Sequence, residues 1–217
     1  HLYKYGFGER TYIDLYGEKS GLIPDRKWKL KTKALPWYPG ETLNVGIGQG
    51  YFLATPMQLT LATASLATNG ETYTPHLLLG DKNNKTNEIS VYKHKNNKFS
   101  TLFKHPDYLE IVKHAMWRVV NEKRVGTASS MKKIRNIEFA GKTGTAQVYN
   151  LDKGKTGTKR LQDHALFISY APFELPEIVV TVVVENGGGG SATAAPIARD
   201  IIEYYMDKKS TSVSMYE

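Results

Sequence analysis

The stretch Phe139-Ala-Gly-Lys-Thr-Gly-Thr-Ala-Gln-Val148 decides how the rest of the chain is interpreted. Its residues alternate in a way that predicts a β-strand with Lys142 at its start. Side chains able to form hydrogen bonds share one face of that strand, namely Thr143, Thr145 and Gln147. On the other face Gly144 has no side chain, so another backbone can approach closely. A cation, hydroxyls and an accessible strand suit an extended peptide that ends in a carboxylate.

A second copy of the same four residues stands at Lys155-Thr-Gly-Thr158. Its neighbours are glycines and charged residues, which are typical of a solvated loop, whereas the first copy is flanked by Phe139 and Val148. The chemistry is therefore assigned to the copy that begins at Lys142. The surrounding segment 150–161 is expected to be a flexible basic connector.

The composition is that of a folded protein, with 217 residues, 41% hydrophobic and 23% charged. The length suits one sizeable domain, and a start at His1 rather than Met suggests a piece of something longer. The net charge of +8 has two interpretations, a solvated surface or attraction to a polyanion. The basic residues are predicted to be spread through loops rather than along one helix, which argues against nucleic acid as a partner. There is no cysteine, and the six histidines have no metal-ligand spacing, so no metal site is expected. No cofactor is predicted either, because the one candidate fingerprint is incomplete, as described below. The longest apolar run, 178–184, is too short to cross a membrane.

Several elements can be placed from local signals. Residues 1–54 are rich in Gly, Pro and aromatic residues, which predicts turns and ordered loops. Thr55-Pro-Met-Gln58 is a capping box, so a helix begins at Pro56 and stops near Gly70. Short strands are predicted over 73–79 and 88–93, with a polar run between them.

The second half of the chain predicts a sheet with helices around it. A strong helix begins at Pro106, with its apolar face on Tyr108, Val112, Ala115, Met116 and Val119, and a shorter helix is expected over 127–133. Strands are expected over 165–171 and 178–184; the second reads as a strand covered on both faces. A helix over 194–206 follows, with Ile197, Ile201, Ile202 and Tyr205 on its apolar side. Because loops rather than helices connect the strands, the fold class is α+β, an antiparallel sheet covered by helices.

An ordered series of motifs resembles the C-terminal part of a class B penicillin-binding protein transpeptidase domain over residues 1–217. Lys-Thr-Gly is an element of β-lactamases and penicillin-binding proteins. The other motifs that carry the resemblance are Tyr5-Gly-Phe-Gly8, Val45-Gly-Ile-Gly-Gln-Gly50, Ala54-Thr-Pro-Met-Gln58, Gly126-Thr-Ala128, Asp163-His-Ala165 and Glu185-Asn-Gly-Gly188. Pro36-Trp-Tyr38 and the Glu185 turn resemble the branch of the family that elongates rod-shaped bacteria.

The resemblance implies a serine acyltransferase that cross-links D-Ala-D-Ala stem peptides of peptidoglycan and is trapped by β-lactams. It implies catalytic roles for Lys142 and Thr145, and substrate binding by Lys142, Thr143, Gly144, Thr145 and Gln147. The Thr145 backbone N–H would be one oxyanion-hole donor. It further implies an anchor in the bacterial inner membrane, a periplasmic location and elongation-complex partners.

The nucleophile of the family is missing from the chain. The family needs Ser-x-x-Lys at a helix start and Ser-x-Asn or Ser-x-Asp, both well before Lys-Thr-Gly. Three Ser-x-x-Lys matches occur, beginning at Ser90, Ser129 and Ser130; the first falls on a predicted strand and the others come too late. The serine is therefore expected on an upstream part of the same protein, and residues 1–217 alone are expected to be inactive.

Other functions share some of these residues. A β-lactamase or D,D-carboxypeptidase shares Lys-Thr-Gly, and a penicillin-sensing or scaffold domain of the same fold would bind without turnover. A dinucleotide fingerprint at Gly187-Gly-Gly189 lacks the second parallel strand that it requires. A Walker loop lacks its first glycine before either Lys142 or Lys155.

Overall fold

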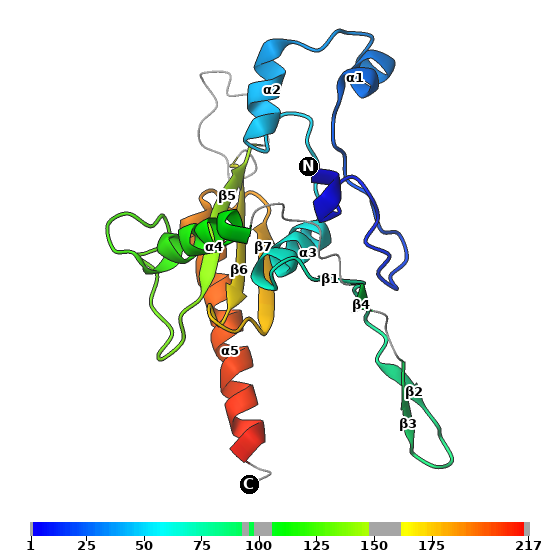
Figure 1. The fold of residues 1–217 in the computed structure, drawn as a ribbon, viewed down its shortest axis with the longest axis vertical. Coiled ribbons are helices and arrows are strands. Elements are labelled where there is room, and N and C mark those ends of the chain that lie inside the picture. Colours follow the sequence, from blue (N-terminus) through cyan, green and yellow to red (C-terminus); the bar gives the residue numbers. More distant parts are fainter. Residues whose placement is uncertain (1, 93–95, 98–105, 148–161, 215–217) are drawn as a thin grey trace. The chain divides into compact units, whose positions relative to one another are not determined.

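The structure is a computed structural model that describes residues 2–92, 96–97, 106–147 and 162–214 (Figure 1). The elements in chain order are η1 (Leu2–Tyr5), α1 (Arg26–Lys33), α2 (Pro39–Gly46), α3 (Pro56–Ala67), β1 (Thr72–Tyr73), β2 (Gly80–Lys82), β3 (Ile89–Val91), β4 (Asn96–Asn97), α4 (Pro106–Asn121), β5 (Ala140–Ala146), β6 (His164–Ala171), β7 (Ile178–Val184), η3 (Gly190–Ala194) and α5 (Ala195–Ser214). In the described part of the chain, every helix is too short or too polar to cross a bilayer. The predicted connector 150–161 lies outside the described residues.

The chain divides into two compact units. The first comprises residues 1–65 and 70–102, and the second comprises residues 66–69 and 103–217. The candidate residues on β5 all belong to the second unit.

The first unit is organised around the buried side chain of Gln58 on α3. Its amide nitrogen donates to the carbonyl oxygens of Glu9 at 2.7 Å and Ser20 at 2.8 Å. Its amide oxygen accepts the Thr55 N–H at 2.9 Å, and the Gln58 N–H donates to the Thr55 hydroxyl at 3.1 Å. The predicted capping box is therefore confirmed, and the same side chain also fixes two loops near the N-terminus.

The prediction that residues 1–54 form only turns and loops is wrong, because α1 and α2 lie within them. The Asp25 carboxylate caps α1 by accepting the Trp28 N–H at 2.6 Å, and Pro39 opens α2. Five of the eight residues of α1 are basic, so part of the positive charge does lie along one helix.

The prediction of one strand over residues 73–79 is also wrong, because its bounds differ from those of the observed strands. Residues 72–73 and 80–82 form strands, and the N–H groups of Leu77 and Leu78 between them donate to the Asp14 carboxylate at 2.6 and 2.8 Å. These hydrogen bonds hold the pKa of Asp14 below its usual value. The backbone donors that a β-ladder would use are thus satisfied by a side chain.

The second unit is built on a three-stranded antiparallel sheet in the order β5-β6-β7. Lys142 pairs with Ile168, and Gly144 pairs with Leu166. The predicted antiparallel sheet is confirmed, and β6 and β7 lie within one residue of the ranges predicted for them. The β7 strand is not covered on both faces as predicted, since Val183 is 38% exposed.

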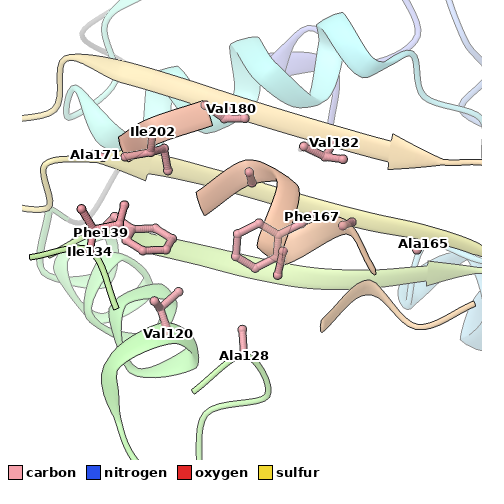
Figure 2. Packing of buried hydrophobic residues seen from close by; sticks show 13 residues of the cluster. Val120, Ala128, Ile134, Phe139, Ala165, Phe167, Ala171, Val180, Val182 and Ile202 are labelled. Atoms are coloured by element: carbon pink, nitrogen blue, oxygen red, sulfur yellow. The ribbon is translucent and has the colours of Figure 1, made fainter. Parts of the chain in front are cut away.

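Helices cover the two faces of this sheet (Figure 1). Phe167, Val180 and Val182 point to one face and pack with α5, whereas Ala140 and Tyr170 point to the other face and pack with α4 and the end of α3. Figure 2 shows the core on the α5 side. Its buried residues are Val120, Ala128, Ile134, Phe139, Ala165, Phe167, Ala171, Val180, Val182, Ala194, Ala195, Ala198 and Ile202.

The buried faces of α4 and α5 differ from the predicted ones. Ala194 at the end of η3 and Ala195, Ala198 and Ile202 on α5 are fully buried. The predicted Ile197, Ile201 and Tyr205 are each about 40% exposed. The small alanines let the helix lie close to the sheet, so the contact face is not the one with the largest apolar side chains. On α4 the buried residues are Leu109, Met116 and Val120, and Tyr108 is 64% exposed.

The helix predicted over 127–133 is absent, and the segment forms tight turns instead. Its backbone is held at the end of α4, where the Ala128 N–H donates to the Val119 carbonyl at 3.0 Å. A Cβ at Gly126 would lie 2.3 Å from the Arg118 carbonyl oxygen and 2.4 Å from that of Val119. The close approach of Gly126 to α4 therefore fixes the turn.

Replacing Gln58 by methionine should lower the free energy of unfolding by roughly 2 to 4 kcal/mol, because buried backbone groups lose their hydrogen-bond partner. Chemical denaturation of the intact protein measures the change. Lys132→Met at an exposed position is the control and should change stability by less than about 0.5 kcal/mol. Equal effects of the two variants would contradict the role of Gln58 as the organising side chain.

The Tyr170 hydroxyl is fully buried and has no hydrogen-bond partner in the described structure. Burial raises the pKa of this phenol, with further contributions from Glu110 and Glu174. Tyr170→Phe removes the unsatisfied group and should keep or raise stability, by up to about 1 kcal/mol at pH 8.

The same variant should also change the response to alkali. The unfolded phenol ionises near pH 10, whereas the folded one keeps its proton, so Tyr170 costs stability as the pH rises above about 10. Denaturation at pH 8 and pH 11 should show a smaller loss for Tyr170→Phe than for the wild type. An identical loss in both proteins would contradict the burial of the phenol.

Candidate active site at the edge of the sheet

Strand β5 carries the predicted site residues Lys142, Thr143, Gly144 and Thr145, and Gln147 follows its last residue directly. Among the described strands β5 pairs only with β6, so its other side is an edge of the sheet. Lys142, Thr145 and Gln147 are exposed, and Thr143 is half-buried. The fold thus places these residues together on one accessible strand.

The backbone of β5 presents polar groups to this edge. The Lys142 ammonium donates to the Thr143 carbonyl oxygen at 2.9 Å. Because this carbonyl oxygen accepts from the Lys142 ammonium, we infer that the Thr143 carbonyl is directed away from β6. In an antiparallel strand the direction of the backbone groups repeats every second residue, so the Thr145 N–H is directed to the same edge.

The Thr143 hydroxyl has a partner that the sequence did not reveal. The Thr127 hydroxyl lies 3.0 Å from it, at the turn after α4. Gly126 packs on the α4 carbonyls and so positions Thr127 beside β5. The motif Gly126-Thr-Ala128 was a signal for this segment, but only the fold brings its hydroxyl to the strand.

Two further features shape the strand. A Cβ at Gly141 would lie 2.4 Å from the ring of Phe167, so this glycine lets an aromatic side chain of the core pass across β5. At the start of the strand the Asn121 amide donates to the carbonyl oxygens of Trp117 and Phe139, both at 2.9 Å. The amide of Asn121 therefore ties the end of α4 to the beginning of β5.

The three rejected Ser-x-x-Lys matches are not at helix starts. Ser90 lies on β3, and Ser129 and Ser130 lie in the turns after α4. None has the setting of a nucleophile whose lysine is one helical turn away.

The arrangement can bind an anion that lies along a strand. The Lys142 ammonium carries a charge, and no described carboxylate lies within ion-pairing distance of it. Hydroxyls of Thr143 and Thr145 lie on the same strand, and the Thr127 hydroxyl lies 3.0 Å from that of Thr143. Such groups form charge-assisted hydrogen bonds with a carboxylate, and the strand edge can pair with an extended peptide.

Comparison with known proteins agrees with this geometry. Residues 1–203 match the family described as "Penicillin binding protein transpeptidase domain". Peptidoglycan D,D-transpeptidase MrdA of Haemophilus influenzae is 40% identical over 224 residues, which covers 98% of this chain and 33% of that protein. MrdA of Escherichia coli K12 is 37% identical over 208 residues, covering 94% of this chain and 32% of that protein. The chain thus spans about a third of the length of these relatives.

Solved structures show the same similarity. Pseudomonas aeruginosa PBP2 in complex with WCK 5153 matches with a TM-score of 0.73 and 38% identity, over 94% of this chain and 42% of that one. Helicobacter pylori PBP2, in its complex with MreC, matches with a TM-score of 0.74 and 34% identity, over 94% of this chain and 34% of that one.

Replacing Gly126 by alanine should lower the free energy of unfolding by about 1 to 3 kcal/mol, because the new methyl group overlaps two carbonyl oxygens of α4. Chemical denaturation measures this change. Gly40→Ala is the matched control, since a Cβ there meets nothing within 4 Å, and it should leave stability unchanged or slightly higher. A stable Gly126→Ala protein would contradict the close packing of the Thr127 turn on α4.

Proposed function

Because this chain belongs to the family of penicillin-binding protein transpeptidase domains, we propose that it supplies one wall of the active site of a peptidoglycan D,D-transpeptidase. The observation that carries the proposal is the accessible edge of β5, where Lys142, Thr143 and Thr145 lie in sequence. The substrate is a stem peptide ending in D-Ala-D-Ala, which lies along this edge as an extended strand.

In this proposal the strand binds the C-terminal carboxylate of the stem peptide. The Lys142 ammonium exchanges its carbonyl partner for the carboxylate, and the hydroxyls of Thr143 and Thr145 donate to the same group. Thr127 holds the Thr143 hydroxyl in place from the side. Gly144 keeps the strand approachable, and Gln147 contacts the substrate further along.

The reaction proceeds in two acyl-transfer steps. A serine hydroxyl attacks the penultimate carbonyl, the peptide C–N bond breaks, and D-Ala leaves with the proton that the serine gave up. An amine of a neighbouring stem peptide then attacks the ester carbonyl, and the bond between the acyl carbon and the serine oxygen breaks. The serine oxygen takes up the proton that the amine loses, and a new amide remains. The Thr145 N–H stabilises the oxyanion that forms in each step.

The serine and its base belong to a part of the protein outside residues 1–217. The absence of a Ser-x-x-Lys at a helix start in this chain supports that placement. The activity of the intact protein therefore needs both parts, and residues 1–217 alone do not acylate.

The relatives also support a cellular setting for the intact protein. The Helicobacter pylori PBP2 structure contains MreC, and we include an elongation-complex protein of this kind among the proposed partners. The proposed location is the periplasmic face of the bacterial inner membrane, where peptidoglycan and β-lactams are accessible.

Lys142→Ala in the intact protein should lower the rate of acylation by a fluorescent penicillin by at least about 100-fold, since a preorganised charge in the site is lost. Lys155→Ala is the matched control, because it alters the second Lys-Thr-Gly-Thr copy, and it should label at the wild-type rate. Equal losses would overturn the choice of β5. A wild-type protein that takes up no label would instead indicate a scaffold domain.

A further inference from the structure

The backbone that lies against Gly144 on β5 belongs to the chain itself. Gly190 opens η3, a π-helical turn in which the Ala195 N–H donates to the Gly190 carbonyl. A Cβ at Gly190 would lie 2.5 Å from the Gly144 carbonyl oxygen, 3.1 Å from the Gly144 nitrogen and 2.4 Å from the Leu166 carbonyl oxygen. Contacts this short with backbone atoms mean that a side chain at this position fits only if the neighbouring backbone shifts.

The neighbouring glycine shows that this requirement is specific. A Cβ at Gly189 would meet nothing within 4 Å, and its φ of −85° is accessible to any residue. Gly190 likewise has no positive φ. The need for glycine at 190 therefore comes from space and not from backbone conformation.

The segment that carries Gly190 is held firmly before the turn. The Asn186 N–H donates to Nδ1 of His164 at 2.9 Å, and the Gly188 N–H donates to the Asp163 carbonyl at 2.8 Å. Within the segment the Thr193 hydroxyl donates to the Gly187 carbonyl at 2.8 Å. These hydrogen bonds fix the segment to the start of β6.

Burial in the core also anchors the segment after the turn. Ala194, Ala195 and Ala198 are fully buried and belong to the core cluster of the sheet. Strand β6 is paired on both sides, whereas β5 is paired with β6 alone among the described strands. If η3 and β5 are pushed apart, the edge strand is therefore the part that shifts.

We propose that Gly190 is a positioning residue of the acyl-transfer site and that η3 fixes the position of β5 by direct backbone contact. The inference rests on the function proposed above. Direct contact of η3 with the Gly144 carbonyl sets the position of the planar peptide group that this carbonyl shares with the Thr145 N–H. A methyl group at 190 displaces this donor from the oxyanion and leaves Lys142, two residues earlier, nearly in place.

The test compares Gly190→Ala with Gly189→Ala in the intact protein, by stopped-flow labelling with a fluorescent penicillin. Such kinetics separate the acylation rate constant from the dissociation constant of the initial complex. Gly190→Ala should lower the rate constant about tenfold or more, as expected for a misplaced oxyanion donor, with a smaller change in the dissociation constant. Gly189→Ala should stay within about twofold of the wild type for both constants.

Gly80→Ala controls for general destabilisation, because its Cβ would lie 2.2 Å from the Ser90 carbonyl oxygen on a different sheet. It should lower thermal stability without changing the acylation rate constant of the folded protein. If Gly190→Ala does not fold, Thr193→Val decides the question, because it loosens η3 by removing one hydrogen bond and should slow acylation several-fold.

The outcomes separate the two proposals. A wild-type protein without labelling would overturn the proposed function. If the wild type labels and Gly190→Ala has the same acylation rate constant as Gly189→Ala, only the positioning role of Gly190 and η3 would be overturned. The positioning role would also be overturned if Gly190→Ala raises the dissociation constant of the initial complex by as large a factor as it lowers the acylation rate constant. If Gly190→Ala does not fold, unchanged acylation kinetics of Thr193→Val would overturn it.

Discussion

The candidate site depends on the unequal pairing of strand β5. Seven residue pairs join it to β6 along one side, and among the described strands nothing pairs with its other side. An unpaired strand edge is normally a hazard, because it invites association with other chains. Here the edge carries Lys142 and is bordered by the Thr127 turn, so its exposed donors and acceptors can serve a peptide substrate instead.

A strand that is held from one side needs other supports to keep its geometry. The first is Asn121, whose amide bonds the Phe139 carbonyl just before β5. The second is the Thr127 turn, where Gly126 packs on the end of α4. The third is Gly190, which meets the strand at Gly144. Two of these supports are glycines, which allow two backbone segments to touch directly. Such backbone contact leaves less freedom of movement than contact between side chains.

Local features could be predicted from the sequence, whereas long-range contacts could not. The capping box at Thr55 and Gln58 and the β-branched run of β7 involve neighbouring residues, and both elements were found. The start signals of α1 and α2, Asp25 and Pro39, were also present, but the glycines and aromatics around them favoured loops. The buried face of α5 was missed because alanines such as Ala198 make the contact, and their small size hides it from a count of apolar side chains.

The surroundings of two lysines show why the site could not be identified from the sequence without the fold. The Lys29 side chain is buried, pairs with Glu41 at 2.6 Å and lies 4.3 Å from the centre of the Tyr38 ring, so its charge is already satisfied within the first unit. The Lys142 side chain is exposed and donates to the neutral Thr143 carbonyl. An ammonium gains from exchanging a neutral acceptor for a carboxylate, because attraction between opposite charges is then added to the hydrogen bond. Lys142 can therefore turn to a substrate without leaving a buried partner unpaired, which Lys29 cannot do.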